Sequence, residues 1–156
     1  MNPTIEFAKA SDVDEISMLS REYIEYGLRR RYTPERLRQL MADSSKNIVV
    51  ARNNEKLLGF GIMTYRNDDA NLDLLAVKQS HRRQGIARKI VEWLTEVAMQ
   101  AGVHSVYVQV RELNSGAVKF YQQLNFHKID ELAGYYQGKE TGVIFCKTLR
   151  PVFTAT

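Results

Sequence analysis

The segment at residues 72–88 constrains the fold of this 156-residue chain more than any other. It opens with the run 72–77, which is apolar except for Asp73 and is typical of a strand buried on both faces. A polar, basic loop follows, and from Gly85 onward the apolar residues recur at helical spacing. A buried strand joined through a loop to an amphipathic helix predicts a domain in which helices cover a sheet.

The turn before that helix has the composition of an anion site. The first turn of a helix carries unpaired N–H groups and the positive end of the helix dipole. Gly85 and Ala87 keep this turn bare, so a phosphate can approach the backbone, and Arg82, Arg83 and Arg88 add positive charge. The alternative is an ordinary helix start with a solvated run of charges.

The rest of the chain alternates between strand and helix patterns. Trp93 is expected in the core, and Ser11 is expected to cap the first helix. The predicted strands are 5–8, 48–51, 57–65, 72–77, 106–110, 126–133 and 143–149, and the predicted helices are 11–27, 33–41, 85–102 and 114–125. The order β-α-α-β-β-β-α-β-α-β-β predicts an α/β (α+β) mixed sheet covered by helices, in one domain spanning 1–156.

Composition excludes several classes of protein. The single cysteine, Cys146, excludes an internal disulfide framework and a thiolate zinc cluster, and it suits the cytoplasm; no metal site is predicted. The N-terminus lacks the pattern of a signal peptide, and the longest apolar stretch, 57–63, is far below the roughly 20 residues that cross a bilayer. Lys and Arg number 22 against 18 Asp and Glu, a net charge of +4. This excess suits a polyphosphate or an acidic partner, whereas nucleic acid and membrane are not expected partners.

Residues 82–87, Arg-Arg-Gln-Gly-Ile-Ala, resemble the Gln/Arg-x-x-Gly-x-Gly/Ala signature of the GCN5-related N-acetyltransferase (GNAT) superfamily. The resemblance implies a GNAT fold with a mostly antiparallel central sheet, and acetyl-CoA as the cofactor. It also implies that backbone amides of the turn hold the pyrophosphate while the preceding strand pairs with the pantetheine arm. The implied cofactor-binding residues are Leu75, Ala76, Val77, Arg82, Arg83, Gln84, Gly85, Ile86, Ala87 and Arg88.

Residues 114–126 resemble a second motif of the superfamily, Asn-x-x-Ala-x-x-x-Tyr-x-x-x-Gly-Phe, with Asn125 in place of the Gly. The resemblance implies that Asn114 hydrogen-bonds the cofactor arm and that the Tyr121 hydroxyl faces the cofactor sulfur. A phenol with a pKa of about 10 can protonate a thiolate as the C–S bond breaks. Taken without the resemblance, Tyr121 is a packing aromatic and Asn114 is a helix cap.

The catalytic base is the open question. Residues 108–114 resemble those of ribosomal-protein alanine N-acetyltransferases, in which a Glu serves as base, but this chain has Gln109 there. An amide takes no proton at neutral pH, so Gln109 would act by relaying a water. Asp73 is the other candidate, because several small-amine acetyltransferases of the superfamily carry a carboxylate at this position. Its alternative role is a charge at a sheet edge or an anchor for a neighbouring loop.

The resemblance places the acceptor between the first pair of helices and the last hairpin, which implies Tyr26, Tyr135 and Tyr136 as substrate-binding residues. The cations at 29–31 either attract a carboxylate or form a solvated loop. The expected function is transfer of an acetyl group to a primary amine by direct attack in a ternary complex. The first acceptor is a protein N-terminal α-amine, and the second is a small-molecule amine such as a polyamine, an amino acid or an antibiotic-like amine. A non-catalytic acyl-CoA-binding regulatory module is the third interpretation, and the chain is expected to be a monomer or a homodimer.

Overall fold

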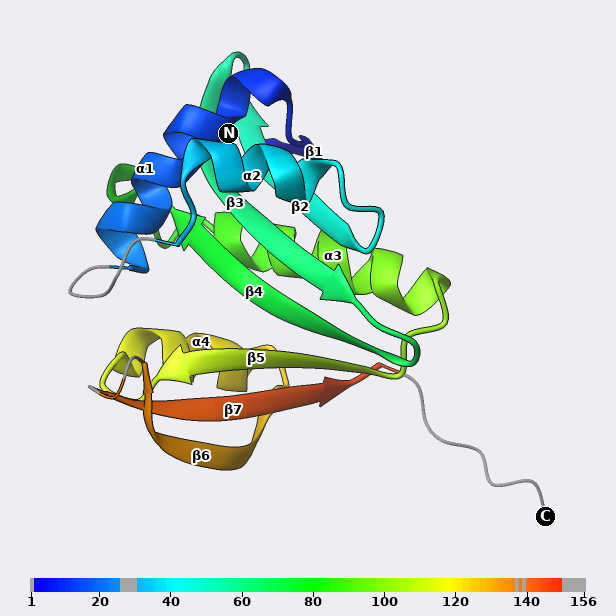
Figure 1. Ribbon diagram of the computed structural model, residues 1–156, viewed down its shortest axis with the longest axis vertical. Helices are drawn as coiled ribbons and strands as arrows, with labels where there is room; N and C mark the ends of the chain where they lie inside the picture. The colour runs from blue at the N-terminus through cyan, green and yellow to red at the C-terminus, as the bar shows by residue number, and fades with distance from the viewer. Residues whose placement is uncertain (1, 26–30, 137, 139, 150–156) are drawn as a thin grey trace. The chain divides into compact units, whose positions relative to one another are not determined.

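The structure, a computed structural model, describes residues 2–25, 31–136, 138 and 140–149. Its element order is the predicted β-α-α-β-β-β-α-β-α-β-β (Figure 1). The elements are β1 (Thr4–Phe7), α1 (Val13–Tyr23), α2 (Pro34–Met41), β2 (Lys46–Asn53), β3 (Lys56–Tyr65), β4 (Asp69–Val77), α3 (Ile86–Gln100), β5 (Ser105–Arg111), α4 (Ser115–Gln123), β6 (His127–Tyr136) and β7 (Glu140–Thr148), with single 3₁₀ turns at Ala10–Asp12 and Gln79–His81.

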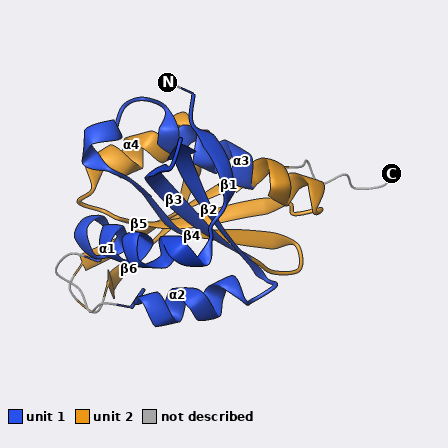
Figure 2. Ribbon diagram, turned by 90° about the horizontal axis from the view of Figure 1, so that it is seen from above, with its two compact units in different colours: residues 1–64, 73–94 blue, residues 65–72, 95–156 orange. Residues whose placement is uncertain are grey.

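Among the described residues the strands form one seven-stranded sheet in the order β1-β2-β3-β4-β5-β7-β6. The β1–β2, β2–β3, β5–β7 and β6–β7 pairs are antiparallel, as predicted, and β4 and β5 are parallel. The parallel register joins residues 69–72 of β4 to residues 105–108 of β5. The chain divides into two compact units, residues 1–64 with 73–94 and residues 65–72 with 95–156 (Figure 2). The boundaries fall at the end of β3, within β4 and within α3.

The first unit is a three-layer arrangement. Helices α1 and α2 cover one face of the strands β1 to β4, and the first part of α3 covers the other (Figures 1 and 2). Val13, Ile16 and Leu37 of the two helices pack with buried residues of β2 and β3, including Phe60. On the opposite face, a Cβ at Gly61 would lie 2.8 Å from Ile90 Cγ2, so only glycine allows α3 to approach β3 this closely.

The second unit packs α4 against β5, β7 and β6. Val106, Val108 and Val110 alternate inward on β5, as the sequence predicts, and Phe126 and Phe145 are fully buried beside them. Asn125, with φ of 68°, ends α4 in the left-handed conformation that replaces the usual Gly. No helix in the described part of the chain is long and apolar enough to cross a bilayer.

Three local predictions need correction. Ser11 does not cap the first helix: Ala10–Asp12 form a 3₁₀ turn in which Asp12 Oδ2 accepts the Lys9 N–H at 2.8 Å, and α1 follows. Helix α1 ends at Tyr23, and the predicted stop at Gly27 lies outside the described residues. Trp93 is only half-buried, because it stacks edge-to-face on the exposed Phe7 ring at 5.4 Å.

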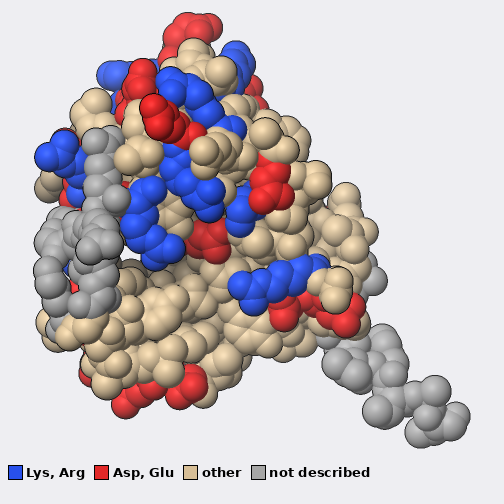
Figure 3. All heavy atoms as spheres, viewed as in Figure 1, with Lys and Arg blue, Asp and Glu red and all other residues tan. Residues whose placement is uncertain are grey.

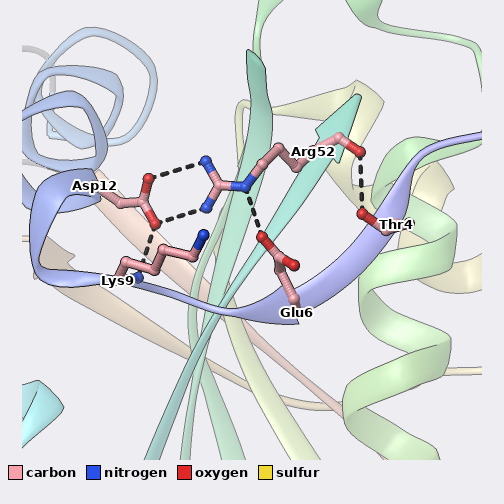
Figure 4. Close-up of polar contacts among 5 residues, drawn as sticks. All are labelled: Thr4, Glu6, Lys9, Asp12 and Arg52. Atoms are coloured by element: carbon pink, nitrogen blue, oxygen red, sulfur yellow. Dashed lines mark hydrogen bonds and ion pairs between the residues drawn. The ribbon is translucent and has the colours of Figure 1, made fainter. Parts of the chain in front are cut away.

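A partly buried arginine links the N-terminal segment to the sheet (Figure 4). Arg52 of β2 donates to both oxygens of Asp12, at 3.1 and 2.8 Å, and to Glu6 of β1 at 2.6 Å. Burial by itself raises the pKa of Asp12, but the bonds from Arg52 and from the Lys9 N–H outweigh it and hold that pKa below its usual value. The ionised carboxylate therefore contributes to the stability of the fold.

Replacing Arg52 with Met is expected to lower the free energy of unfolding by about 3–5 kcal/mol at pH 7, because a buried carboxylate loses its cation. The pKa of Asp12 is depressed in the folded state, so its contribution is present above the unfolded pKa of about 3.9 and is lost as the pH falls through the folded value. Urea unfolding at pH 7, 5 and 3 should show the gap between wild type and variant closing at the lowest pH. Lys128→Met, which removes the exposed pair to Glu131, is the matched control and should change little. An equal gap at all three values would contradict this account.

Candidate functional site

The turn between β4 and α3 contains two residues in the left-handed conformation. Arg83 has φ of 62° and Gly85 has φ of 80°, so left-handed residues alternate along the turn. Nothing lies within 4 Å of a Cβ built at Gly85, so glycine is favoured there by the backbone conformation and not by a lack of space. The residues 82–85 are exposed, and Ile86 then begins a 15-residue helix. The Arg82 N–H donates to the Gln79 carbonyl at 3.3 Å, whereas the N–H groups of residues 83–85 are available to a negatively charged ligand.

The three arginines around the turn lie differently. Arg83 is exposed, and Arg88 is exposed beside Glu92 at 3.3 Å. Arg82 lies back on the turn, because its Nε donates to the Val77 carbonyl at 3.2 Å and its guanidinium stacks 4.6 Å from the centre of the Tyr23 ring. Arg82 therefore supports the shape of the turn, a contribution that the charge pattern alone did not reveal.

Cations also gather elsewhere on the first unit. On the face that Figure 3 shows, Lys and Arg side chains lie over α1 and α2, with Asp and Glu interspersed. Of the predicted acceptor cations, Arg31 is described and its guanidinium lies 6.0 Å from the centre of the Tyr32 ring. The predicted substrate residue Tyr26, with Arg29 and Arg30, lies outside the described residues.

The residues that follow this segment are fixed by a buried carboxylate. Glu25 is only 6% exposed, and it accepts the Ser20 hydroxyl at 2.8 Å, the Tyr32 N–H at 3.4 Å and the Arg31 N–H. Ser17 donates its hydroxyl to the Tyr32 carbonyl at 2.6 Å, so both backbone groups of Tyr32 are held. The sequence did not identify Glu25, because a charged residue that follows the apolar positions of a helix has the same pattern as a solvent-exposed side chain.

Asp73 lies on β4, one residue beyond the part of the strand, residues 69–72, that pairs with β5. The Thr64 hydroxyl donates to Asp73 Oδ2, and Lys46 Nζ donates to the same Thr64 oxygen at 2.8 Å. Burial, and then the nearby Asp73 charge, raise the pKa of Tyr32. Within the first unit, a carboxylate and a protonated phenol are therefore near each other.

In the second unit, the two residues of the second motif lie on α4. Asn114 caps the helix, its Oδ1 accepting the Ala117 N–H at 3.1 Å, as the cap interpretation predicted. Tyr121 is 5% exposed and makes edge-to-face contacts with Phe120 and Phe126, at 5.0 and 5.4 Å between ring centres. Burial, and then the neighbouring Tyr136, raise the pKa of Tyr121 well above its usual value. Its phenol is thus protonated at neutral pH, which is the form that donates a proton.

Gln109 has a partner that the sequence did not predict. Asn71 Nδ2 donates to Gln109 Oε1 at 3.0 Å, and Gln109 Nε2 donates to Asn71 Oδ1 at 2.8 Å, so the two amides form a reciprocal pair. Neither amide accepts a proton at neutral pH. Asn71 lies two residues before Asp73 and therefore on the same face of β4. The alternation of side chains along the strand is the sequence signal that could have identified Asn71 as a site residue.

The predicted acceptor residues Tyr135 and Tyr136 belong to strand β6, which continues past its predicted end at residue 133. Their rings meet edge-to-face at 5.0 Å. Tyr135 is 46% exposed, whereas the Tyr136 ring lies 5.6 Å from the guanidinium of Arg111, a buried residue. Arg111 also lies 3.2 Å from a carboxylate oxygen of Glu140, the residue paired with Tyr136 across the hairpin. Hairpin pairing therefore extends strand β6 through these two tyrosines.

The sequence model of the Acetyltransferase (GNAT) family matches residues 13–126, which include both motifs. This chain belongs to the GNAT family. It is 31% identical over 94 residues to the [ribosomal protein bS18]-alanine N-acetyltransferase of Escherichia coli K12, a match that covers 58% of this chain and 64% of that protein, slightly under two thirds of its length.

Solved structures of the family share the fold. The ribosomal-protein-S18-alanine N-acetyltransferase from Escherichia coli superposes with a TM-score of 0.84 at 21% identity, covering 97% of both chains. Arabidopsis thaliana NAA60 in complex with acetyl-CoA superposes with a TM-score of 0.83 at 17% identity, covering 95% of this chain and 99% of that one. These likenesses confirm the predicted fold of this GNAT protein.

Proposed function

We propose that this protein transfers an acetyl group from acetyl-CoA to a primary amine, and that the acceptor is the α-amine of a protein N-terminus. The observation that carries the proposal is the exposed turn at residues 82–85, in which Arg83 and Gly85 are both left-handed immediately before α3. A diphosphate is the ligand that such a bare turn before a helix, with arginines beside it, suits best.

Each residue then has a role. The N–H groups of residues 83–88 bind the diphosphate, and the main chain of Leu75, Ala76 and Val77 pairs with the pantetheine arm. Asn114 binds that arm from the start of α4. Acetyl-CoA supplies an activated thioester, whose carbonyl carbon the amine attacks. Tyr121 protonates the sulfur as the C–S bond breaks, and the proton that the amine loses passes to water.

The Gln109–Asn71 pair favours an α-amine as the acceptor. With an amide where related enzymes have a Glu base, the acceptor must already have an appreciable neutral fraction. An α-amine has a pKa of about 7.7–8.0, so about a tenth or more is neutral near pH 7. A lysine side chain, at about 10.4, is about 2.5 units worse, which is about 3.4 kcal/mol. The bS18-alanine N-acetyltransferase of Escherichia coli, by its name, acts on an alanine of a ribosomal protein, which supports the same choice.

A small-molecule amine is the second candidate, and Asp73 favours it. A carboxylate bonded to Thr64 and near Tyr32 would attract a cationic amine and accept its proton. Asp73 would then be the base that Gln109 cannot be.

Peptides that carry one free α-amine and one lysine separate these candidates. With acetyl-CoA, we expect mass-shift mapping to place the acetyl group on the α-amine at least about 100-fold faster than on lysine, which follows from the pKa difference. Asp73→Asn should keep peptide acetylation within a few-fold of wild type, as should the control Asp14→Asn on the exposed face of α1. Acetylation of polyamines that is abolished by Asp73→Asn alone would favour the small-molecule acceptor. CoA binding without thiol release from any amine would indicate a non-catalytic module.

A further inference from the structure

The phosphate-binding turn is attached to α1 through the side chain of Tyr23. The Tyr23 hydroxyl accepts the Gln79 N–H at 3.3 Å, and its ring carries the Arg82 guanidinium at 4.6 Å. Gln79 is the first residue of the 3₁₀ turn that begins the loop, and Arg82 directly follows its last residue. We propose that Tyr23 is a positioning residue, which holds the turn in the shape that binds the diphosphate. This inference rests on the proposed binding of acetyl-CoA.

Arg82 is the link between Tyr23 and the strand. Its Nε donates to the Val77 carbonyl at 3.2 Å, so the Tyr23 ring, the guanidinium and the last carbonyl of β4 form one continuous set of contacts. A planar guanidinium can stack on a ring and donate in its own plane at the same time, which a lysine cannot do. Tyr23 thus fixes Arg82, and Arg82 fixes the end of the strand from which the turn leaves.

A second contact from the same helix supports this arrangement. Glu15 forms an ion pair with Lys78, the residue that follows β4. Glu15 and Tyr23 are eight residues apart, so both lie on one face of α1. Together they line a groove of about 630 Å³ with Gln79 and Ser80, which shows that this face of Tyr23 borders the loop and is not enclosed in the core.

The loop also has backbone bonds of its own, from the Lys78 N–H to Leu58 and from the Arg82 N–H to Gln79. Its residues 82–85 are exposed, and two of them are left-handed. A loop of this kind must be ordered before its N–H groups converge on a ligand. The loss of conformational entropy on ordering weakens binding unless the loop is already ordered in the free protein. Contacts that hold Gln79 and Arg82 in the free protein therefore increase the affinity for the diphosphate without touching it.

The test compares donors with and without the diphosphate. In Tyr23→Leu, which removes both contacts, we expect the Kd for CoA by calorimetry and the KM for acetyl-CoA to rise about 10-fold, as expected for losing the ring–guanidinium contact and one hydrogen bond. Tyr23→Phe keeps the ring and loses only the hydroxyl, so both constants should rise only about threefold. With acetyl-pantetheine, which lacks the diphosphate, kcat/KM should be unchanged in both variants. A general loss of structure would lower kcat/KM for both donors alike.

Two further measurements make the outcome decisive. The Arg82 Nε–H signal in ¹⁵N NMR of the ligand-free protein should be protected from exchange in wild type and Tyr23→Phe, and should lose that protection in Tyr23→Leu. Arg21→Ala, which removes an exposed cation from the same helix, is the control and should change neither ratio nor signal. Wild type that fails to bind CoA would overturn the proposed function and this inference together. If wild type binds CoA but Tyr23→Leu keeps the wild-type preference for acetyl-CoA over acetyl-pantetheine, this inference alone is overturned.

Discussion

Replacing Tyr121 with Phe is expected to lower kcat for thiol release by about 100-fold to 10,000-fold, the range for removing a general acid. The Tyr121 phenol is buried and its pKa is raised, so it holds its proton throughout the neutral range. The departing sulfur leaves as a thiolate, and a thiol has a pKa of about 8.5. At neutral pH the thiolate therefore takes up a proton, which a nearby group must supply. Phenylalanine keeps the contacts with Phe120 and Phe126, so the Kd for CoA and the stability should change little.

Tyr107→Phe is the matched control for this experiment. Tyr107 is a half-buried tyrosine on β5 of the same unit, and its loss of one hydroxyl should leave kcat within a few-fold of wild type. Thiol release with a saturating α-amine peptide measures both variants. A fully active Tyr121→Phe would remove the proton-donor role and leave Tyr121 as a packing residue.

Replacing Gly85 with Asp is expected to raise the Kd for CoA by at least about 100-fold, which is about 2.7 kcal/mol. The substitution places a carboxylate at the centre of the exposed N–H groups, where it repels the diphosphate and competes for the same donors. A Cβ at this position meets nothing within 4 Å, so the side chain itself fits. The strain comes from φ of 80°, which Asp tolerates better than most residues.

Gly102→Asp separates the charge at the turn from the backbone strain. Gly102 follows the other end of α3, has φ of 90°, and also has open space around its Cβ position. Both variants should lose about the same stability in urea, of the order of 1 kcal/mol. Only Gly85→Asp should weaken CoA in isothermal titration calorimetry. Equal affinity in the two variants would place the diphosphate elsewhere.

Features set by neighbouring residues could be predicted. Thr33 caps α2 before Pro34, with its hydroxyl accepting the Arg36 N–H at 3.2 Å, and Asn54 turns the β2–β3 hairpin with φ of 57°. The cap at Asn114 and the helix start after Gly85 also follow from residues within one turn of each other. Where the local pattern is ambiguous, prediction failed. Asp12 rather than Ser11 receives the backbone N–H at the start of the chain, because Arg52 of a different strand draws its carboxylate inward.

The sequence by itself determined the order of strands and helices, the bare turn at residues 82–87 and the family, because hydrophobic period, caps and motifs are local along the chain. Only the tertiary structure decided which polar groups pair. Gln109 meets Asn71 from 38 residues away, and Tyr23 meets the Gln79 backbone from 56 residues away. In the sequence, each of these side chains looks the same as a solvent-exposed one. Its partner is set by the sheet and by α1, which bring distant segments of the chain together. That is why the partner of Gln109 and the support of the phosphate-binding turn emerged from the fold and not from the motifs.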